Sequence, residues 1–262
     1  MPGNATLGPL LRDRVAVVTG GSRGIGAGIA AALVGAGARV VISGRRAEVL
    51  EATADEIGAT AVVADAADRD DAGEPVRQAI ERFGGIDILV NNVGGNAGGN
   101  PNLFAGEPED DDGFEANLRL NLTAAYWPTR AAVRSMRERG HGRVINIGSG
   151  ASKHAAASPG YTAAKHGLVG LTKQLALDLA RHGITVNCVC PGWTNTDLVD
   201  FDVLAKAQGI STSEARERAE AESAQRRILE PSELGPMCIL LASDAGAPMT
   251  GQVIGVDGGY RL

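Results

Sequence analysis

Aromatic residues, cysteines and long apolar segments are all scarce in this chain of 262 residues. It contains two Trp, three Tyr, four Phe and three Cys. No stretch approaches the roughly 20 consecutive apolar residues of a membrane span. The N-terminal stretch MPGNATLGPLLRDR lacks the basic start and the apolar run of a secretory signal. These absences predict a soluble protein with no membrane partner.

Basic residues are also fewer than acidic residues. The chain has 25 Lys and Arg against 31 Asp and Glu, which gives a formal net charge of −6. A protein that neutralises phosphates along a strand needs clustered basic side chains. The charge balance therefore excludes nucleic acid as a main partner.

The three cysteines, Cys188, Cys190 and Cys238, form no spaced disulfide framework. An odd number without such spacing favours a reducing compartment, and we predict a cytoplasmic location. Cys188 and Cys190 flank a valine in an apolar run, and no third or fourth ligand lies nearby in the sequence. We therefore interpret them as buried strand residues rather than ligands, and we predict no metal site.

Glycine, by contrast, is abundant, with 36 residues, about twice its usual share. Hydrophobic residues at 44% and charged residues at 21% are close to the values of globular proteins. The excess of glycine therefore does not indicate disorder or a collagen-like chain.

Short β-branched runs alternate with longer alanine-rich segments along the chain. Strands are predicted at residues 15–19, 39–43, 61–64, 86–91, 143–147, 184–190 and 252–256. Helical spacing is found at residues 25–35, 47–57, 70–83, 114–139, 161–182 and 232–243. The alternation predicts the α/β class: a Rossmann-type doubly wound parallel sheet of about seven strands with helices on both faces, in a single domain over residues 1–262. Such sheets bind ligands at the carboxyl ends of their strands.

The first predicted strand runs directly into a glycine-rich turn, residues 20–26, with the sequence GGSRGIG. Glycines there allow positive φ, let the backbone approach a pyrophosphate and let the next helix pack on the sheet. The N-terminus of that helix offers amide donors and a positive dipole end to phosphate. This context favours a dinucleotide site over a bare structural turn. The predicted cofactor contacts here are Gly20, Ser22, Arg23, Gly24, Ile25 and Gly26.

The end of the second predicted strand indicates which dinucleotide is bound. An NAD site usually has an acidic residue there, about 20 residues beyond the glycines, that binds the ribose 2′-hydroxyl. This chain instead has Arg45 and Arg46, which would attract a 2′-phosphate through charge-assisted hydrogen bonds. Arg23 could reach the same phosphate. The alternative is that these arginines cap the next helix or are solvated. We favour the phosphate contact and predict NADP(H) over NAD(H).

Three motifs, in this order, resemble the short-chain dehydrogenase/reductase family. They are TGGSRGIG at residues 19–26, NNVG at residues 91–94, and Tyr161 and Lys165 in YTAAK. The resemblance extends from about residue 12 to the C-terminus. Overall the chain resembles the carbonyl reductase and 3-oxoacyl reductase-like members, and along GRVIN and GITVNCVCPG it strongly resembles the 3-oxoacyl-thioester reductases. It implies an NAD(P)-dependent dehydrogenase/reductase of the EC 1.1.1 type with a Rossmann fold.

The resemblance implies a catalytic set of Asn121, Ser149, Tyr161 and Lys165. Tyr161 and Lys165 are four residues apart, so they share one helix face, and an ammonium there would lower a phenol pKa that is ordinarily near 10. Tyr161 could then give a proton to a carbonyl oxygen or take one from an alcohol, while Ser149 hydrogen-bonds the same oxygen. The family resemblance further implies that Lys165 binds the nicotinamide ribose and that Asn121 holds a water leading to Lys165. Asn117, one turn earlier, is the competing asparagine.

Further cofactor contacts are implied by the resemblance after the other strands. Asp65 matches the family's acidic residue near the adenine, with a helix-capping role as the alternative. Asn91 is expected to stabilise the centre of the sheet, and Val93 stands where the family usually has alanine. The remaining predicted cofactor contacts are Asp65, Ala66, Asn92, Gly94, Tyr161, Lys165, Pro191, Gly192, Thr194 and Thr196.

Two long segments have no clear pattern. Residues 195–227 carry charge-rich helical spacing, and in the family this segment is a mobile lid over the substrate. Residues 95–113 include an acidic run at 109–112, which we interpret as the first turn of the next helix rather than as a metal site. His154 and Trp193 are the candidate substrate contacts, and Tyr260 is a further candidate.

The leading interpretation is an oxidoreductase that transfers a hydride between NADP(H) and a small-molecule carbonyl or secondary alcohol, with Tyr161 as general acid/base. One alternative is a 3-oxoacyl-thioester reductase of the fatty-acid type. Another is a non-catalytic NADP(H)-binding sensor or scaffold, against which the intact Ser149, Tyr161 and Lys165 count. The predicted helices at 114–139 and 161–182 resemble those through which family members pair, so we expect a homo-oligomer, a tetramer or a dimer.

Overall fold

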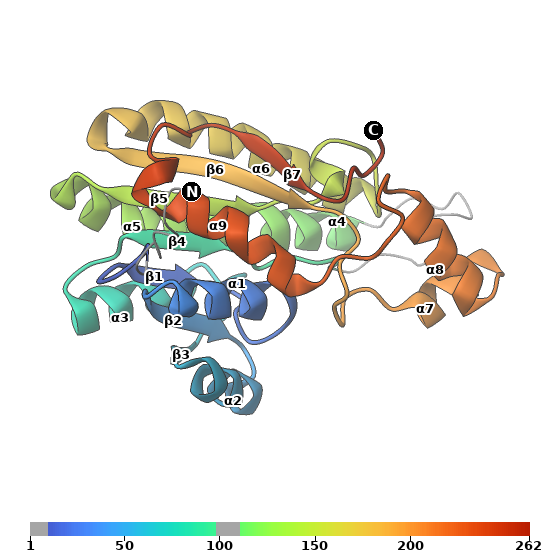
Figure 1. Cartoon of the computed structure of the whole chain (residues 1–262), viewed down its shortest axis with the longest axis horizontal. Helices are drawn as coiled ribbons and strands as arrows, with labels where there is room; N and C mark the ends of the chain where they lie inside the picture. Colours follow the sequence, from blue (N-terminus) through green and yellow to red (C-terminus); the bar gives the residue numbers. More distant parts are fainter. Residues whose placement is uncertain (1–9, 98–110) are drawn as a thin grey trace, which may run out of the picture.

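The structure is a computed structural model, and it describes residues 10–97 and 111–262. Within these residues, seven parallel strands form one sheet (Figure 1). Their spatial order is β3-β2-β1-β4-β5-β6-β7. Helices cover both faces of this sheet, so the predicted fold class is confirmed. The strands are β1 (Val15–Val18), β2 (Arg39–Gly44), β3 (Thr60–Val63), β4 (Ile88–Asn91), β5 (Gly142–Ile147), β6 (Ile184–Pro191) and β7 (Val253–Val256).

Helices connect the successive strands, as crossovers between parallel strands require. The α-helices are α1 (Gly24–Gly35), α2 (Ala47–Ile57), α3 (Glu74–Phe83), α4 (Asp111–Leu118), α5 (Ala124–Arg139), α6 (Pro159–Leu179), α7 (Phe201–Gln208), α8 (Thr212–Ala221) and α9 (Gly235–Ala242). The short turns are the π-helical η2 (Arg119–Thr123) and the 3₁₀ turns η3 (Gly150–Ser152), η4 (Ala180–His182), η5 (Pro231–Leu234) and η6 (Asp244–Gly246).

Alternate residues of each strand pack on opposite faces of the sheet, because side chains along a strand point to the two faces in turn. In β1, Ala16 and Val18 belong to the core built with α1, α2 and α9. Val15 and Val17 belong to the core built with α3, α5 and α6. Both faces are covered, which explains why the strands read as continuous apolar runs.

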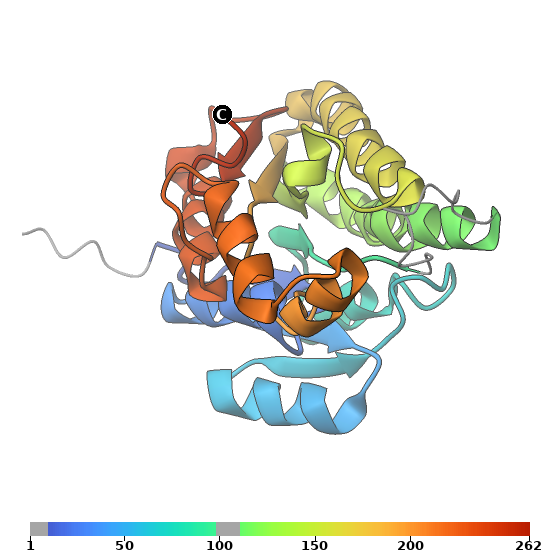
Figure 2. The same ribbon diagram turned by 90° about the vertical axis from the view of Figure 1, so that its right-hand side faces the viewer.

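The winding of the chain reverses at β1, since β2 and β3 lie on one side of this strand and β4 to β7 on the other. Doubly wound sheets bind their ligands at such a reversal, outside the carboxyl ends of the strands. The helices α7 and α8 extend beyond this edge of the sheet (Figure 1 and Figure 2).

The helix predicted at 114–139 is observed, and it contains the π-turn η2 between α4 and α5, which the sequence spacing did not predict. The Arg119 carbonyl accepts the amide of Ala124, five residues further on. The same carbonyl accepts the Thr123 hydroxyl at 2.9 Å. A side-chain bond of this kind competes with the regular helical ladder. Single π-turns inside helices are frequent at functional sites, and this one contains Asn121.

Charged side chains gather at the opposite, amino edge of the sheet. Asp87 is almost fully buried and accepts the Arg139 guanidinium and the Val15 amide, each at 2.8 Å. Arg143 is also buried there. His141 has a buried Nε2 without a hydrogen-bond partner. Burial, and then the nearby guanidinium of Arg143, lower the pKa of His141 below its ordinary value.

We expect His141 to make the fold less stable in mild acid. Its contribution to stability is present above the unfolded pKa of about 6.5 and is lost as the pH falls through the lower folded pKa. His141→Gln should therefore reduce the loss of unfolding free energy between neutral pH and about pH 5, measured by urea unfolding. His166→Gln, at an exposed position of α6, is the control. An unchanged pH dependence in His141→Gln would contradict this expectation.

Candidate functional site

The turn between β1 and α1 requires glycine. Gly20 and Gly24 have φ values of +64° and +54°, a conformation that residues with a Cβ rarely adopt. A Cβ on Gly26 would lie 2.2 Å from the Gly20 carbonyl oxygen and 2.4 Å from Asn92 Nδ2. Arg23 precedes α1 and gives it no side-chain cap, so the first amides of α1 have no side-chain acceptor from their cap residue. A dinucleotide pyrophosphate fits a turn of this kind.

Two asparagines at the end of β4 hold the turn and the sheet. Asn92 Nδ2 donates to the carbonyl oxygens of Thr19 and Gly20, at 3.1 and 3.0 Å. Asn91 Nδ2 donates to Asn146 Oδ1 of β5 at 2.8 Å. The prediction that Asn91 stabilises the centre of the sheet is confirmed. The side chain of Asn92, predicted to contact the cofactor, is bonded to the glycine turn.

The arginines predicted to select the dinucleotide lie in different places. Arg45 follows β2, its side chain is 75% exposed, and its Nη1 lies 3.9 Å from Asp65 Oδ2. Arg23 instead reaches the segment after β6, where its Nη1 donates to Asp197 Oδ2 at 2.8 Å. The structure therefore brings Arg45 to the acidic residue predicted beside the adenine, and it pairs Arg23 with a different carboxylate.

The other residues predicted on the adenine side surround the end of β2. Ser22 lies against it, since a Cβ on Gly44 would be 3.1 Å from Ser22 Oγ. Arg46 is exposed and precedes α2 without a side-chain cap. Asp65 Oδ1 accepts the amide two residues further on at 2.9 Å, which is the capping-type bond left open as its alternative. Ala66 is buried.

Asn121 and Lys165 approach each other at Gly94. A Cβ on Gly94 would lie 2.9 Å from Asn121 Oδ1 and 3.0 Å from Lys165 Nζ. The amide side chain of Asn121 pairs with the backbone of Gly95, accepting its N–H at 2.9 Å and donating to its carbonyl at 2.8 Å. The buried Lys165 ammonium donates to the Ile147 carbonyl at 2.9 Å. These contacts join the loop after β4 to η2 and α6.

The competing asparagine, Asn117, is also part of this network. It is fully buried, and its Oδ1 accepts the Ala97 amide at 3.0 Å. Its Nδ2 donates to Ser158 Oγ at 3.2 Å. Ser158 Oγ in turn accepts the Tyr161 amide at 3.1 Å and so caps the N-terminus of α6. Asn117 therefore links the loop after β4 to the start of the helix that carries Tyr161.

Tyr161 and Lys165 share one face of α6. Lys165 Nζ lies 5.7 Å from the centroid of the Tyr161 ring. Ser149 follows β5 after Gly148, and its Oγ accepts the Ala151 amide at 3.1 Å at the start of η3. Each of the three side chains is thus carried by an element that ends or begins at the carboxyl edge of the sheet.

Two cysteines of β6 lie against the strand end that carries Ser149. Cys188 and Cys190 are fully buried free thiols with their sulfur atoms 3.8 Å apart. A Cβ on Gly148 would lie 2.8 Å from each sulfur, so a larger residue before Ser149 would have to displace the thiols. Hydrogen bonding with Cys190, and then burial, raise the pKa of the Cys188 thiol. Their interpretation as buried strand residues is confirmed.

The segment after β6 returns to the glycine turn. Pro191 ends the strand, and a Cβ on Gly192 would lie 2.8 Å from the carbonyl oxygen of Asp257. Thr194 Oγ1 donates to the Gly192 carbonyl at 3.0 Å. The Thr196 methyl group would lie 3.2 Å from a Cβ on Gly24. The predicted nicotinamide and pyrophosphate segments therefore lie side by side.

The predicted substrate contacts meet the C-terminal residues of the chain. The Tyr260 ring is edge-on to His154 with centroids 6.0 Å apart, and a Cβ on Gly150 would be 2.4 Å from the Tyr260 ring. Trp193 Nε1 donates to Glu222 Oε2 at 2.7 Å. Burial, and then the charge of Glu222, raise the pKa of Tyr260 to about 12. Glu222 was not predicted, because it stands in a charge-rich pattern that marks no single residue.

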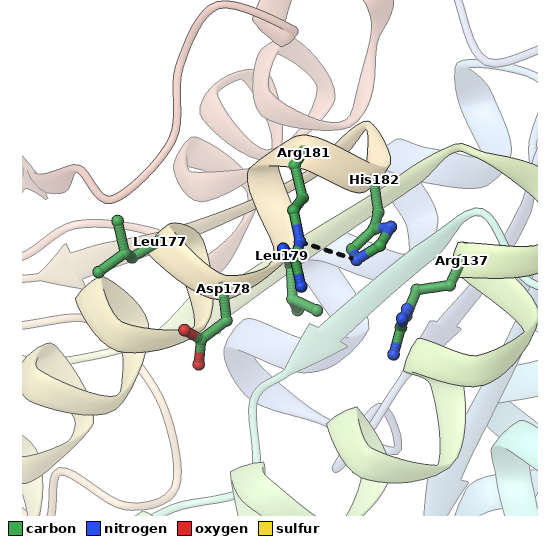
Figure 3. Close-up of a pocket in the computed structure, with 6 residues that line it drawn as sticks. All are labelled: Arg137, Leu177, Asp178, Leu179, Arg181 and His182. Atoms are coloured by element: carbon green, nitrogen blue, oxygen red, sulfur yellow. Dashed lines mark hydrogen bonds between the residues drawn. The ribbon is translucent and has the colours of Figure 1, made fainter.

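A cavity of about 350 Å³ lies elsewhere, at the C-terminal ends of α5 and α6 (Figure 3). Within it Arg181 Nε donates to His182 Nε2 at 3.3 Å. Because η4 leads from here into the start of β6, the cavity belongs to the amino edge of the sheet and not to the candidate site. Its lining residues are Arg137, Leu177, Asp178, Leu179, Arg181 and His182.

Part of the unpatterned segment 95–113, including Glu109 and Asp110 of its acidic run, lies outside the described residues. The acidic residues at 111 and 112 form the first turn of α4, as predicted. Every helix within residues 10–97 and 111–262 is too short or too polar to cross a membrane.

Comparisons with known proteins agree on one family. The profile of the short chain dehydrogenase family matches residues 14–207. D-beta-hydroxybutyrate dehydrogenase of Cupriavidus necator is 36% identical, over 96% of this chain and 99% of that protein. 3beta-hydroxysteroid dehydrogenase 2 of Eggerthella lenta is 34% identical, over 96% of each chain. A solved structure of an actinorhodin polyketide ketoreductase variant with NADPH is 36% identical, with a TM-score of 0.87 over 95% of this chain and 97% of that chain.

Proposed function

Because this chain belongs to the short-chain dehydrogenase family, we propose that it is an NADP(H)-dependent carbonyl reductase or alcohol dehydrogenase. Family membership makes it an oxidoreductase enzyme that acts on hydroxyl or keto groups with a nicotinamide cofactor. The observation that carries the proposal is the approach of Asn121 Oδ1 and Lys165 Nζ to one point at Gly94, beside the ring of Tyr161.

In the proposed mechanism Tyr161 moves the proton. Its hydroxyl gives a proton to a carbonyl oxygen during reduction and takes one from an alcohol during oxidation, and a bound nicotinamide supplies or receives the hydride. Ser149 hydrogen-bonds the same substrate oxygen and fixes its position. The Lys165 ammonium, anchored on the Ile147 carbonyl, places positive charge beside the ring where negative charge develops. Asn121 fixes the Gly95 backbone, and with it the loop over Lys165.

The chain's own residues fit the nicotinamide dinucleotide along the carboxyl edge of the sheet. The glycine turn offers its backbone to the pyrophosphate because no Cβ fills it. Lys165 would bind the nicotinamide ribose, next to Gly94. The adenine side would be held by Ser22, Ile25, Arg45, Arg46, Asp65 and Ala66, and the nicotinamide side by Asn92, Gly94, Pro191, Gly192, Thr194 and Thr196.

The exposed Arg45 supports NADP(H) over NAD(H), and its replacement tests that preference. We expect Arg45→Ala to weaken NADPH binding about tenfold, or roughly 1.4 kcal/mol, because a charge-assisted bond to the 2′-phosphate is lost. NADH affinity should change little. Fluorescence titration of both cofactors measures this, with Arg130→Ala on the exposed face of α5 as the control. Equal affinity for NADPH and NADH, with no loss in Arg45→Ala, would overturn the NADP(H) assignment.

The segment 195–227, with α7 and α8, is proposed as the lid over the substrate of a single-domain enzyme. His154 and Trp193 would contact a small-molecule carbonyl or alcohol. Exposed apolar side chains on α5 and α6, such as Tyr126 and Leu177, support pairing of copies through these helices as a dimer or tetramer. The free thiols fit a reducing, cytoplasmic location.

A narrower candidate is a 3-oxoacyl-thioester reductase, which the likeness to a polyketide ketoreductase supports. The absorbance of reduced nicotinamide, followed with a panel of ketones, keto esters and 3-oxoacyl thioesters, tests both. Turnover of simple ketones would support the carbonyl reductase, and selective turnover of the thioesters would support the narrower candidate. Tight NADPH binding without turnover of any substrate would instead support a sensor.

A further inference from the structure

One carboxylate at the end of α8, that of Glu222, joins segments that lie far apart in the sequence. Its Oε2 accepts the Trp193 indole N–H at 2.7 Å, and its Oε1 accepts the Arg261 guanidinium at 2.5 Å. The same Arg261 guanidinium lies over the Tyr260 ring, 5.1 Å from its centroid. Both hydrogen bonds are charge-assisted, a kind that is shorter and stronger than bonds between neutral groups. The Glu222 side chain is 30% exposed.

Main-chain hydrogen bonds hold the same end of α8 against the C-terminal tail, residues 258–262. The Ala224 amide donates to the Gly259 carbonyl at 3.0 Å, and the Arg261 amide donates to the Glu222 carbonyl at 2.8 Å. Gly259 has a φ of +80°, which lets the tail turn at this point. The last turn of the proposed lid and the tail therefore form one unit.

The tail in turn contacts the loop that begins with Ser149. Arg261 Nη1 donates to the Ala155 carbonyl at 2.9 Å. The Tyr260 ring occupies the space over Gly150 and meets the His154 ring edge-on. Because Tyr260 is only 8% exposed, its ring is packed between the tail and the residues next to the proposed catalytic serine.

Trp193 completes the connection from the other side. It follows Gly192 at the end of β6, and its ring lies 6.3 Å from that of Phe201, the first residue of α7. The indole thus contacts the first helix of the proposed lid through Phe201 and the end of the second through Glu222. Glu222 thus contacts two of the chain's few aromatic side chains, Trp193 directly and Tyr260 through the Arg261 guanidinium that lies over its ring.

We infer that Glu222 is a positioning residue that holds Trp193 and Tyr260 as one wall of the substrate pocket, and that this wall receives a neutral, apolar group of the substrate. The inference rests on the proposed function for its substrate. The charges in the wall are paired with each other. Arg261 pairs with Glu222, and Lys153 pairs with Asp257, with Lys153 Nζ 3.7 Å from Asp257 Oδ2. Two aromatic rings with paired charges favour a neutral ketone or alcohol over a carboxylate substrate.

Loss of the Glu222 carboxylate should leave its donors without an acceptor and release both rings. The half-buried Trp193 indole N–H then lacks an acceptor and pays a desolvation cost, while Arg261 keeps only its bond to the Ala155 carbonyl. The wall therefore rearranges while Tyr161, Ser149 and Lys165 keep their own contacts. The substrate KM for an aryl or alkyl ketone should rise about tenfold, a change of roughly 1.4 kcal/mol in binding. The kcat at saturation and the KM for NADPH should change much less.

The test compares Glu222→Ala and Glu222→Gln with the control Glu217→Gln, an exposed residue on the same helix. Glu222→Gln keeps the shape and one acceptor oxygen, so its effect should be intermediate, and it serves if Glu222→Ala does not fold. Trp127→Phe is introduced in every protein, because Trp127 and Trp193 are the two tryptophans of the chain. The emission spectrum then reports on Trp193 without any turnover.

We expect the Trp193 emission to change in both Glu222 variants and to stay unchanged in Glu217→Gln. A changed emission together with an increased KM for the neutral ketone in the Glu222 variants supports the inference. In the unaltered enzyme, a KM for a keto acid that is much higher than the KM for the neutral ketone also supports it. Unchanged emission overturns the positioning role of Glu222, whether or not the protein turns over a carbonyl. A changed emission with an unchanged KM overturns the substrate wall alone. Absence of turnover by the unaltered enzyme overturns the proposed function, and with it the role of these residues as a substrate wall. The emission result still tests whether Glu222 positions Trp193.

Discussion

Replacing Tyr161 with Phe is expected to lower kcat for carbonyl reduction by about 10³-fold, the size of a lost general acid. Phenylalanine keeps the ring beside Lys165 and removes only the hydroxyl that gives or takes the proton. The ring packing is preserved, so NADPH affinity and unfolding free energy should stay close to those of the unaltered enzyme. The loss should therefore fall on the chemical step and not on binding.

Steady-state kinetics with a turned-over ketone, together with NADPH titration by fluorescence, measures these quantities. Tyr126→Phe removes the same hydroxyl from a ring on α5 that is 43% exposed, and it serves as the matched control. Full activity in Tyr161→Phe would show that another group supplies the proton. A loss of the same size in Tyr126→Phe would show that the effect comes from the fold and not from proton transfer.

The parts of the site that could be predicted are those in which local backbone chemistry decides the residue type. A buried parallel strand has to be apolar on both faces, so β1, β4 and β5 stand out as apolar runs. The turn at Gly20 and Gly24 needs positive φ, and the sequence provides glycine there. Helical spacing likewise predicts a shared face for Tyr161 and Lys165.

The parts that could not be predicted are pairings between side chains distant in the sequence. From the sequence Arg23 could reach the 2′-phosphate, yet in the structure its guanidinium lies against Asp197, 174 positions later. Glu222 is one of several glutamates in α8 and the residues after it, and only the folded chain brings the indole of Trp193 to it. Such contacts depend on where loops are placed in the fold, and loop placement produces no periodic pattern of apolar residues in the sequence.

The π-turn η2 is an intermediate case. Asn121 was chosen over Asn117 from the sequence that follows it, and the structure gives both asparagines buried contacts with the loop after β4. A regular helix would keep residues four apart on one face. Asn117 lies in α4 and Asn121 within η2, so the π-turn falls at the second asparagine. Spacing alone predicted the helix and could not predict this local change.

Replacing Gly26 with Ala is expected to abolish tight cofactor binding and to destabilise the fold by about 1–3 kcal/mol, the usual range for overpacking. The added Cβ would meet the Gly20 carbonyl oxygen at 2.2 Å and Asn92 Nδ2 at 2.4 Å. The first is backbone, and Asn92 is held by its bonds to Thr19 and Gly20. The turn must therefore move as a whole, away from the position that the pyrophosphate needs.

Gly35→Ala, in the same helix, isolates that effect. A Cβ on Gly35 would meet nothing within 4 Å, so alanine there should be neutral or stabilise the helix by about 0.5–1 kcal/mol. Urea unfolding and NADPH titration of both variants separate loss of fold from loss of site. If Gly26→Ala bound NADPH as tightly as Gly35→Ala, the turn would have room for a Cβ, and its close approach to a dinucleotide could not be the reason for glycine at position 26.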